Sequence, residues 1–335
     1  MRSTTRQLQG LVEINLLRHR EGVLNPEWLL DVLACPLCTR SLNISEERQL
    51  ECRACGVAFS ISAGGQPDMR LTSPVELTQL HKATSALVKT ARRIHKSVGR
   101  RLRTRLYEMG ERVECCFCHW TGSQFLPAGQ DQVPNRLCPR CGSLERYRAL
   151  YFYLKDHSGI VTQPTYVLDV ATKPCFRMFC ESLPNVKYVS SDLMTKGAMI
   201  FSDLTQMGMA SESFDLITCM HVMEHIPNDL AAFSEIGRLL KPNGFAIVVV
   251  PLKSEKTSED PDARPEDYER LYGQNDHVRY YGMDIADRMR GVGLNVEVID
   301  LLSLYPEDVL RRNALYGDDR YFFRLSSVAP ALLAH

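Results

Sequence analysis

The chain has 335 residues, and its 40 lysines and arginines balance its 40 aspartates and glutamates. This length allows two or more domains with separate cores, and the neutral charge favours no polyanionic partner for the chain as a whole. Its first twenty residues lack the apolar core of a secretion signal, and no apolar run approaches the roughly 20 residues that span a bilayer. We therefore expect a cytoplasmic protein without a membrane span, in which paired cysteines indicate metal ligands more often than disulfides.

Eight of the twelve cysteines form four Cys-x-x-Cys pairs. The spacing lets both thiolates of one turn reach the same tetrahedral ion, and a second turn completes a closed structural site. In the stretch "CCFC" we prefer Cys115 to Cys116 as the ligand. Gly56 and Gly142 each follow a second ligand, where the turn needs a positive φ. We predict two structural Zn²⁺ sites with these ligands: Cys35, Cys38, Cys52 and Cys55 in the first, and Cys115, Cys118, Cys138 and Cys141 in the second. The alternative is eight reduced thiols without metal.

The first set of cysteines belongs to an expected zinc ribbon over residues 29–70, after an N-terminal extension at 1–28. Its text, "LLDVLACPLCTRSLN" followed by "LECRACGVAFSISAGGQPDM", resembles the zinc-ribbon family of tRNA-methyltransferase activator subunits. Members of that family accompany methyltransferases as a partner or as a fused domain. The resemblance implies a possible protein partner through the ribbons.

A basic segment lies within the expected linker at 71–110. Residues 82–105 contain nine lysines or arginines and no acidic residue, and apolar side chains recur at helical spacing at Leu87, Ala91, Ile94 and Val98. Such a helix could lie along RNA or an anionic membrane surface. We favour a solvated connecting helix, because no interleaved aromatic residues are present to stack on bases.

After the second expected ribbon, at 111–150, the pattern changes to apolar strands that alternate with helices over 151–335. This alternation predicts an α/β fold with a mostly parallel sheet covered on both faces. In such folds ligands bind beyond the carboxyl ends of the strands. The residues that follow each strand are therefore the candidates for a binding site.

Acidic residues stand at the ends of three successive expected strands, namely Asp169, Asp192 and Asp203, and His221 follows the fourth. An acidic residue after the second strand is placed to bind a ribose diol, and Asp203 is placed to accept a hydrogen bond from an adenine amine. Each aspartate could instead cap a helix or form a turn. Three in register favour a nucleotide-type cofactor site.

The stretch "SESFDLITCMHVMEHIPNDLAAFSEIGRLLKPNGFAIVVVP", residues 211–251, resembles class I S-adenosylmethionine-dependent methyltransferases of the type 11-like group. Residues 273–299 and 138–154 resemble a bacterial subgroup that also carries a zinc ribbon. The resemblance implies a Rossmann-like sheet of seven strands, the last one antiparallel, with S-adenosylmethionine (SAM) as cofactor. It assigns the ribose to Asp192, the adenine to Asp203 with Leu204, and the methionine end to the turn after the first strand. Leu193 is also expected among the cofactor-binding residues.

That turn departs from the glycine-rich pattern of the family, because it reads Ala171, Thr172, Lys173, Pro174. Alanine is small enough for close approach of a ligand. Proline fits the first turn of a helix, and Lys173 could pair with the carboxylate of the cofactor. The alternative is a turn that no longer binds cofactor, as in a structural or regulatory pseudoenzyme.

The stretch "HVMEH", residues 221–225, fits the H-x-x-E-H pattern of a zinc protease. That pattern needs a long helix, whereas Pro227 follows here and a strand precedes. We therefore expect His221 to line the cofactor pocket, and Glu224 with His225 to fix the turn.

Methyl transfer needs mainly alignment and exclusion of water, and it needs a base only if the acceptor must lose a proton. The candidates lie in "QNDHVRYYG": His277 as the base, Arg279 as a holder of an acidic acceptor, and Tyr281 beside them. The polar stretch before them is typical of a mobile lid. The alternative is that these residues only brace the lid.

The sequence thus predicts SAM-dependent methyl transfer to a small-molecule or peptide acceptor. One alternative is an RNA methyltransferase in which the ribbons and the basic helix deliver the substrate. It is less favoured, because no Asn-Pro-Pro-Tyr-type motif follows the fourth strand. The other alternative is a non-catalytic scaffold that binds a partner protein.

Overall fold

The computed structural model describes residues 29, 31–44, 49–61, 66–70, 107, 110–129, 131–194, 197–317 and 319–327. The expected N-terminal extension and the basic helix at 82–105 lie outside these residues. Within them, no helix has both the length and the apolar character needed to cross a bilayer.

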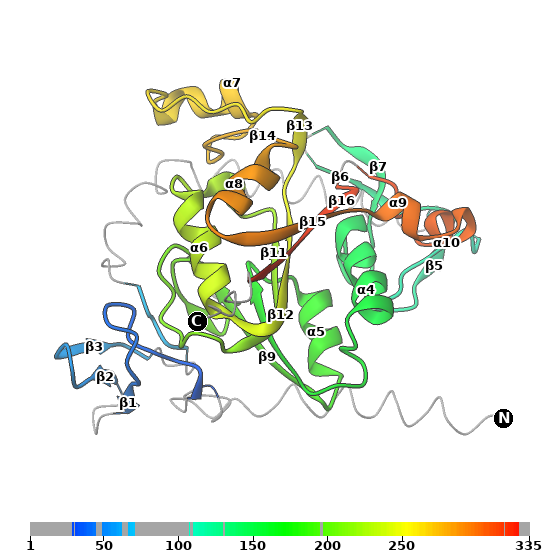
Figure 1. The fold of residues 1–335 in the computed structure, drawn as a ribbon. Helices are drawn as coiled ribbons and strands as arrows, with labels where there is room; N and C mark the ends of the chain where they lie inside the picture. Colours follow the sequence, from blue (N-terminus) through cyan, green and yellow to red (C-terminus); the bar gives the residue numbers. More distant parts are fainter. Residues whose placement is uncertain are drawn as a thin grey trace, which may run out of the picture.

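A seven-stranded sheet forms the centre of the molecule, in the order β10-β9-β8-β11-β12-β16-β15 (Figure 1). The last strand in the chain runs antiparallel to both of its neighbours, and the other strand pairs are parallel. The predicted mixed sheet with a reversed last strand is therefore confirmed. In chain order the strands are β8 (Thr165–Val170), β9 (Val186–Asp192), β10 (Ile200–Phe201), β11 (Phe214–Met220), β12 (Leu240–Val249), β15 (Leu294–Asp300) and β16 (Tyr321–Ser327).

Helices cover both faces of the sheet. Successive strand residues point to opposite sides, so each strand supplies apolar side chains to both faces. Val167 and Leu168, for example, belong to two different apolar cores. One core contains the buried sides of α4 (Glu145–His157), α5 (Pro174–Glu181), α9 (Leu301–Leu304) and α10 (Glu307–Arg312). The other contains those of α6 (Asp229–Leu239) and α8 (Ile285–Gly291). The predicted two-sided cover is confirmed.

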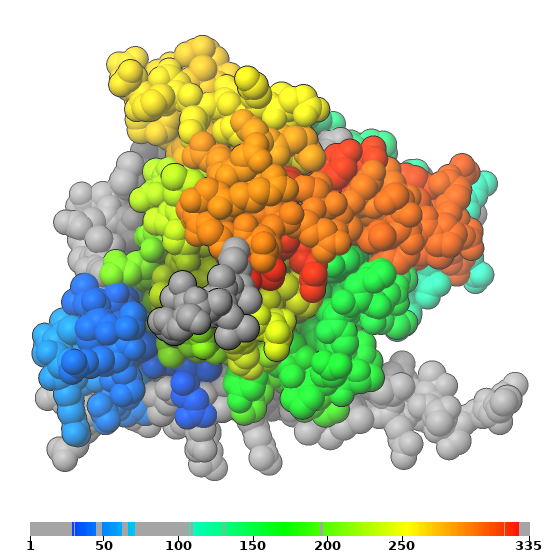
Figure 2. Space-filling model, viewed as in Figure 1, coloured from blue at the N-terminus to red at the C-terminus, as the bar shows by residue number. Residues whose placement is uncertain are grey.

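The first cysteine-containing region packs at the β10 edge of the sheet. It contains the small sheet of β1 (Asn43–Ile44), β2 (Leu50–Cys52) and β3 (Val57–Phe59). Its Ala34 N donates to Gly208 O at 2.9 Å, and Asp68 forms a parallel bridge to Phe201 of β10. Its apolar side chains join the core of the α6 face, and Figure 2 shows this region, in blue and cyan, lying against the body of the protein.

The second cysteine-containing region is joined to the main sheet by a continuous helix. It contains two small hairpins, β4 (Val113–Glu114) with β5 (Thr121–Gly122), and β6 (Leu126–Ala128) with β7 (Val133–Leu137). Helix α4 begins directly after them, so the boundary expected at residue 150 falls inside this helix. Buried Arg148 of α4 donates to the carbonyls of Asn313 at 2.7 Å, Ser143 at 2.9 Å, Arg136 at 3.0 Å and Ala314 at 3.2 Å.

The segment after β12 lies beyond one end of the sheet, at the top of Figure 1. It comprises β13 (Leu252–Ser254), a 3-10 turn (Pro265–Asp267), α7 (Tyr268–Tyr272) and β14 (Tyr281–Gly282). β13 and β14 pair in parallel. The sequence predicts a lid at this place.

Candidate functional site

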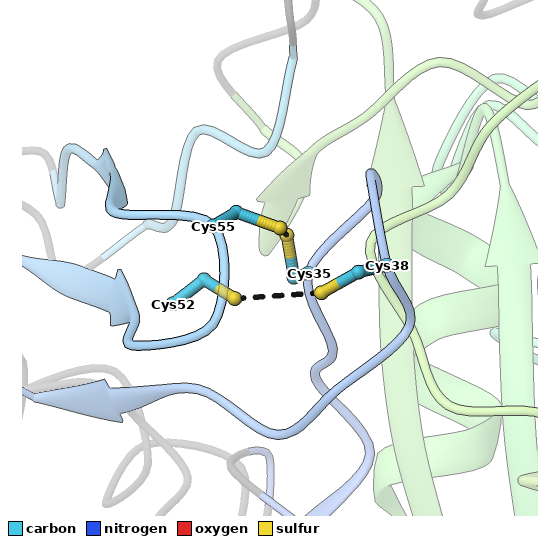
Figure 3. Close-up of side chains that lie close together, drawn as sticks. All are labelled: Cys35, Cys38, Cys52 and Cys55. Atoms are coloured by element: carbon cyan, nitrogen blue, oxygen red, sulfur yellow. Dashed lines mark hydrogen bonds between the residues drawn. The ribbon is translucent and has the colours of Figure 1, made fainter.

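The first four-cysteine cluster contains the predicted cysteines. Cys35 and Cys38 lie on one loop, Cys52 is the last residue of β2, and Cys55 lies on the turn that follows it (Figure 3). Their four sulfur atoms lie within 4.8 Å of one another. The Cys38 and Cys52 sulfurs are 3.5 Å apart, and those of Cys35 and Cys55 are 4.0 Å apart.

The second cluster contains Cys115, Cys118, Cys138 and Cys141, with the same limit of 4.8 Å between sulfurs. The Cys115–Cys141 and Cys118–Cys138 sulfur distances are 3.5 and 3.6 Å. Cys116 is not part of the group, as its position in the turn predicted. Ser143 Oγ lies 3.3 Å from the Cys115 sulfur.

All four cysteine turns share one backbone conformation. The residue after each second cysteine has a positive φ, at Thr39 (57°), Gly56 (69°), His119 (55°) and Gly142 (73°). Each of these residues donates its N–H to the carbonyl of the first cysteine of its pair, at 2.8–3.0 Å. The two glycines were predicted to have this conformation. Thr39 and His119 are not glycines, so their left-handed backbone conformation carries a cost in conformational energy.

These clusters fit a tetrahedral metal ion. A Zn–S bond of about 2.3 Å in a tetrahedron separates neighbouring sulfurs by roughly 3.8 Å, close to the distances in both clusters. Four thiolates without an open position are the ligands of structural zinc sites. Both clusters could therefore bind zinc.

The strand register brings the predicted cofactor residues to one edge of the sheet. Val170 of β8 pairs with Ser191, and Asp192 of β9 pairs with Phe201. Cys219 of β11 also pairs with Val170. The carboxyl ends of these parallel strands therefore lie side by side. They bring together the last residue of β9 and the residues that follow β8, β10 and β11.

Ala171 adopts the backbone conformation that glycine usually provides at this turn. Its φ is 57°, and its N–H donates to Ser191 O at 2.8 Å. An L-residue pays roughly 1–2 kcal/mol for the left-handed region. The turn thus keeps a left-handed bend without a glycine, and the first residue of α5 is Pro174, as predicted. Lys173 is the exposed N-cap residue of α5.

Asp169 was expected at the end of the first strand, among the cofactor-binding residues. It lies one residue before the end of β8 and is fully buried. Its carboxylate accepts hydrogen bonds from Thr218 Oγ1 at 2.7 Å and Tyr188 Oη at 2.8 Å. Burial raises the pKa of Asp169 to about 6, against the opposing effect of its hydrogen bonds. These contacts hold β8, β9 and β11 together below the turn.

Asp192 and Asp203 both form turns with residues two positions later. Asp192 Oδ1 accepts from Met194 N, and Asp203 Oδ1 accepts from Thr205 N, each at 2.8 Å. Asp203 Oδ1 also accepts from Thr205 Oγ1, at 2.7 Å. This turn-forming role is the alternative to cofactor binding that the sequence analysis left open. Leu193 is partly exposed and Leu204 is buried.

His221 stands at the end of β11 with a φ of 58°. Its Nε2 lies 2.9 Å from Asp319 Oδ1, and its Nδ1 lies 3.3 Å from Glu224 Oε1. Burial acts to lower the pKa of His221, but Asp319 and Glu224 outweigh this effect and raise it. Asp319 in turn lies 3.4 Å from Arg136 of β7, so an ion-pair chain links the second cysteine region to this end of the sheet.

The candidate catalytic residues are buried and contact the protein itself. Arg279 donates to Glu259 Oε2 at 2.7 Å and to the carbonyls of Ile226 at 2.5 Å and Pro227 at 2.7 Å. Tyr281 Oη donates to Asp229 Oδ2 at 2.7 Å. These contacts favour the bracing alternative for both residues, and their catalytic role stays a prediction.

His277 is the third candidate and differs from the other two. It is 4 % exposed, and its Nδ1 has no hydrogen-bond partner among the described residues. Burial lowers the pKa of His277. The imidazole is therefore held neutral beside the turn that follows β11.

Sequence reasoning missed three partners of this site. Asp319 stands in no motif and reaches His221 only through the packing of the C-terminal segment. Tyr188 and Thr218 lie inside strands, and only their alignment with Asp169 across the sheet identifies them.

Comparisons with known proteins agree with this geometry. A family model described as a methyltransferase domain matches residues 155–298, and a model described as a Trm112p-like protein matches residues 28–64. A ubiquinone biosynthesis O-methyltransferase from Histophilus somni is 46 % identical over 39 residues, 12 % of this chain. The match spans only 16 % of that curated relative.

Solved structures with a related arrangement include three with low TM-scores. A SAM-dependent methyltransferase from Archaeoglobus fulgidus has 13 % identity and a TM-score of 0.36, over 56 % of this chain and 96 % of that one. One from Aquifex aeolicus has 15 % identity and a TM-score of 0.34, over 52 % and 86 %. A complex containing the Haloferax volcanii Trm112 methyltransferase activator has 14 % identity and a TM-score of 0.34, over 56 % and 93 %.

The sheet order, the reversed last strand and the two family models agree on the nature of the chain. It carries a class I, SAM-dependent methyltransferase domain, preceded by a Trm112-like region.

Proposed function

We propose that this protein transfers the methyl group of SAM to a small-molecule or peptide acceptor. The observation that supports this most is the left-handed turn at Ala171 beside Asp192 at the carboxyl edge of the sheet. A turn of this conformation brings backbone close to a ligand, and an acidic residue at the end of the next strand is placed for a ribose.

In this proposal the adenosyl group lies across the ends of β8, β9 and β10. Asp192 accepts hydrogen bonds from the ribose hydroxyls, with Leu193 beside it. Asp203 accepts from the adenine amine, and Leu204 supports the ring. Lys173, which is exposed at the start of α5, pairs with the carboxylate at the methionine end.

When bound, SAM supplies an activated methyl group on a sulfonium. The chain then has to align the acceptor with that group and exclude water. The segment from β13 to β14 is positioned to do this, because Arg279 fixes it to the turn after β11 and Tyr281 fixes it to Asp229 at the start of α6. His277 lies on the acceptor side of this arrangement, and His221 lies beside the cofactor.

The Trm112-like region suggests a role in methyltransferase partnering. We propose that it supports the methyltransferase domain of its own chain, since it packs on the β10 edge and Arg70 Nη1 donates to Leu193 O at 3.0 Å. Leu193 adjoins the proposed ribose residue. A further protein partner could bind the exposed side of the same region.

Calorimetric titration with SAM and with S-adenosylhomocysteine tests the proposal. We expect one molecule of either per chain. Asp192→Ala should weaken binding by about 10-fold or more, since a hydrogen bond to a charged group contributes roughly 1.5–3 kcal/mol. Asp308→Ala, an exposed change on α10, is the control and should bind normally. Folded, zinc-loaded protein that binds neither compound would favour the non-catalytic scaffold instead.

A further inference from the structure

A third group of metal-ligand side chains lies outside the cysteine clusters. Glu224, His225 and His277 each offer one ligand atom, and these atoms lie within 4.8 Å of one another. Glu224 and His225 stand on a 3-10 turn, Met223–His225, directly after β11. His277 comes from the segment after α7, which is joined to this turn by a hydrogen bond from Val278 N to Glu224 O at 2.9 Å.

The polar atoms of this group are buried and largely unsatisfied. Glu224 is 1 % exposed and His277 is 4 % exposed. Neither carboxylate oxygen of Glu224, nor Nδ1 of His277, makes a hydrogen bond to any residue that the structure describes. The nearest cationic group is His221, whose Nδ1 lies 3.3 Å from Glu224 Oε1. Burial of a carboxylate with an unsatisfied oxygen is costly, and buried carboxylates commonly are fully paired or coordinate metals.

The imidazole of His225 is held as that of a metal ligand commonly is. His225 Nδ1 lies 3.1 Å from the carbonyl oxygen of Asp276 and 3.5 Å from its carboxylate. Metal-ligating histidines almost always use their second ring nitrogen in this way, because the contact fixes the tautomer and the ring. The rings of His225 and His277 meet edge to face, with centroids 4.6 Å apart.

We propose that Glu224, His225 and His277 bind one divalent transition-metal ion of the zinc type. Two imidazoles and one carboxylate are the ligand set of open zinc and non-haem iron sites, in which a further position remains for water or substrate. A bound ion would satisfy Glu224 Oε2, which has no partner among the described residues, and would fasten the segment after α7 to the end of β11. It would also occupy His277, which then would not be a free base.

This site does not rest on the proposed methyl transfer, since the ion would bind whether or not SAM does. It also differs from the protease pattern in the sequence. The histidine pair of that pattern is His221 with His225, whereas here His277 from a distant segment takes the place of His221.

The test is a calorimetric titration of the full-length protein with Zn²⁺, after both cysteine clusters have been saturated and excess metal removed. We expect one further equivalent in the wild type. Glu224→Gln and His277→Gln should each weaken it by about 100-fold or more, given that loss of even an outer partner weakens metal binding about 10–100-fold. His157→Gln, an exposed change at the end of α4, is the matched control and should keep the equivalent.

The shift in melting temperature caused by Zn²⁺ is a second measurement, which can be read even for a variant that is less stable than the wild type. Zn²⁺ should raise the melting temperature of the wild type and of His157→Gln, and should leave both site variants unchanged. The absence of a further equivalent in the wild type would overturn the proposal. So would equal affinity in the wild type and in both site variants.

Discussion

Tyr188 Oη on β9 donates a hydrogen bond of 2.8 Å to Asp169 Oδ2 on β8, in the fully buried layer beneath the left-handed turn. Thr218 on the neighbouring β11 donates to the other oxygen of the same carboxylate. A single buried aspartate therefore joins β8, β9 and β11. Two of these strands, β8 and β9, end at the proposed cofactor site, so we expect Asp169 to act on that site by holding them together.

The raised pKa of Asp169 predicts a pH dependence of stability. Burial raises this pKa from 3.8 to about 6, so between these values the folded state binds more protons than the unfolded chain. The contribution of Asp169 to stability is greatest at low pH and falls by roughly 3 kcal/mol as the pH rises through 6.

Asp169→Asn removes this titration while it keeps the size of the side chain. Urea unfolding of both proteins at pH 4, 5, 6 and 7 measures the difference. The wild type should lose stability relative to the variant as the pH rises, mostly between pH 4 and 6. A constant difference across these pH values would show that Asp169 is ionised throughout.

The left-handed conformation of Ala171 predicts that glycine stabilises the turn. Its φ of 57° costs an alanine roughly 1–2 kcal/mol, and part of the gain from glycine is offset by the greater freedom of the unfolded chain. Ala171→Gly should therefore raise the free energy of unfolding by up to about 1 kcal/mol. Ala232→Gly, inside α6, should lower it by about 1 kcal/mol or more. A loss of stability at both positions would contradict this account of the turn.

The hydrogen bonds of buried Arg148 predict that its loss destabilises the packing of the second cysteine region on the rest of the chain. Its guanidinium is buried and donates to four backbone carbonyls, two of them from the segment at 313–314. Arg148→Met leaves these carbonyls unpaired and should cost at least about 3 kcal/mol. Arg290→Met, on the exposed end of α8, should change unfolding little. Similar urea midpoints for both variants would show that Arg148 is dispensable.

The adjacent thiols of Cys115 and Cys116 provide a matched test of the second cluster. Cys116 stands outside the ligand group, and its burial raises the pKa of its thiol well above the usual value. Cys115→Ser should lower the zinc content by one ion per chain relative to the wild type, and it should lower the melting temperature. Cys116→Ser should keep the full zinc content. Elemental analysis of proteins prepared side by side measures the zinc content. An equal loss of zinc in both variants would contradict the choice of Cys115 over Cys116 as the ligand.

Much of this structure follows from local sequence. The cysteine spacing predicted both clusters and the choice of Cys115, because two turns of fixed geometry leave few ways to enclose one ion. The strand pattern and the family resemblance predicted the mixed seven-stranded sheet. The positive φ at Gly56 and Gly142 followed from the same turn geometry.

The relations that the sequence did not predict all involve residues far apart in the chain. The burial of Asp169 depends on Tyr188 and Thr218, which become its partners only through strand register. For Arg279 the sequence left open whether it holds an acceptor or braces the lid, and its contacts with the turn after β11 depend on how distant segments pack. The contact of Tyr281 with Asp229 arises in the same way. Glu224 and His277 likewise come close together only because the segment after α7 packs against the turn that contains Glu224.

The most direct test of the central claim is a crystal structure of the protein with S-adenosylhomocysteine. The account predicts the adenosyl group across the carboxyl ends of β8, β9 and β10, with the ribose hydroxyls within hydrogen-bond distance of Asp192 and the adenine amine beside Asp203. A ligand bound elsewhere, or an edge of the sheet that stays without ligand at saturating concentration, would contradict it.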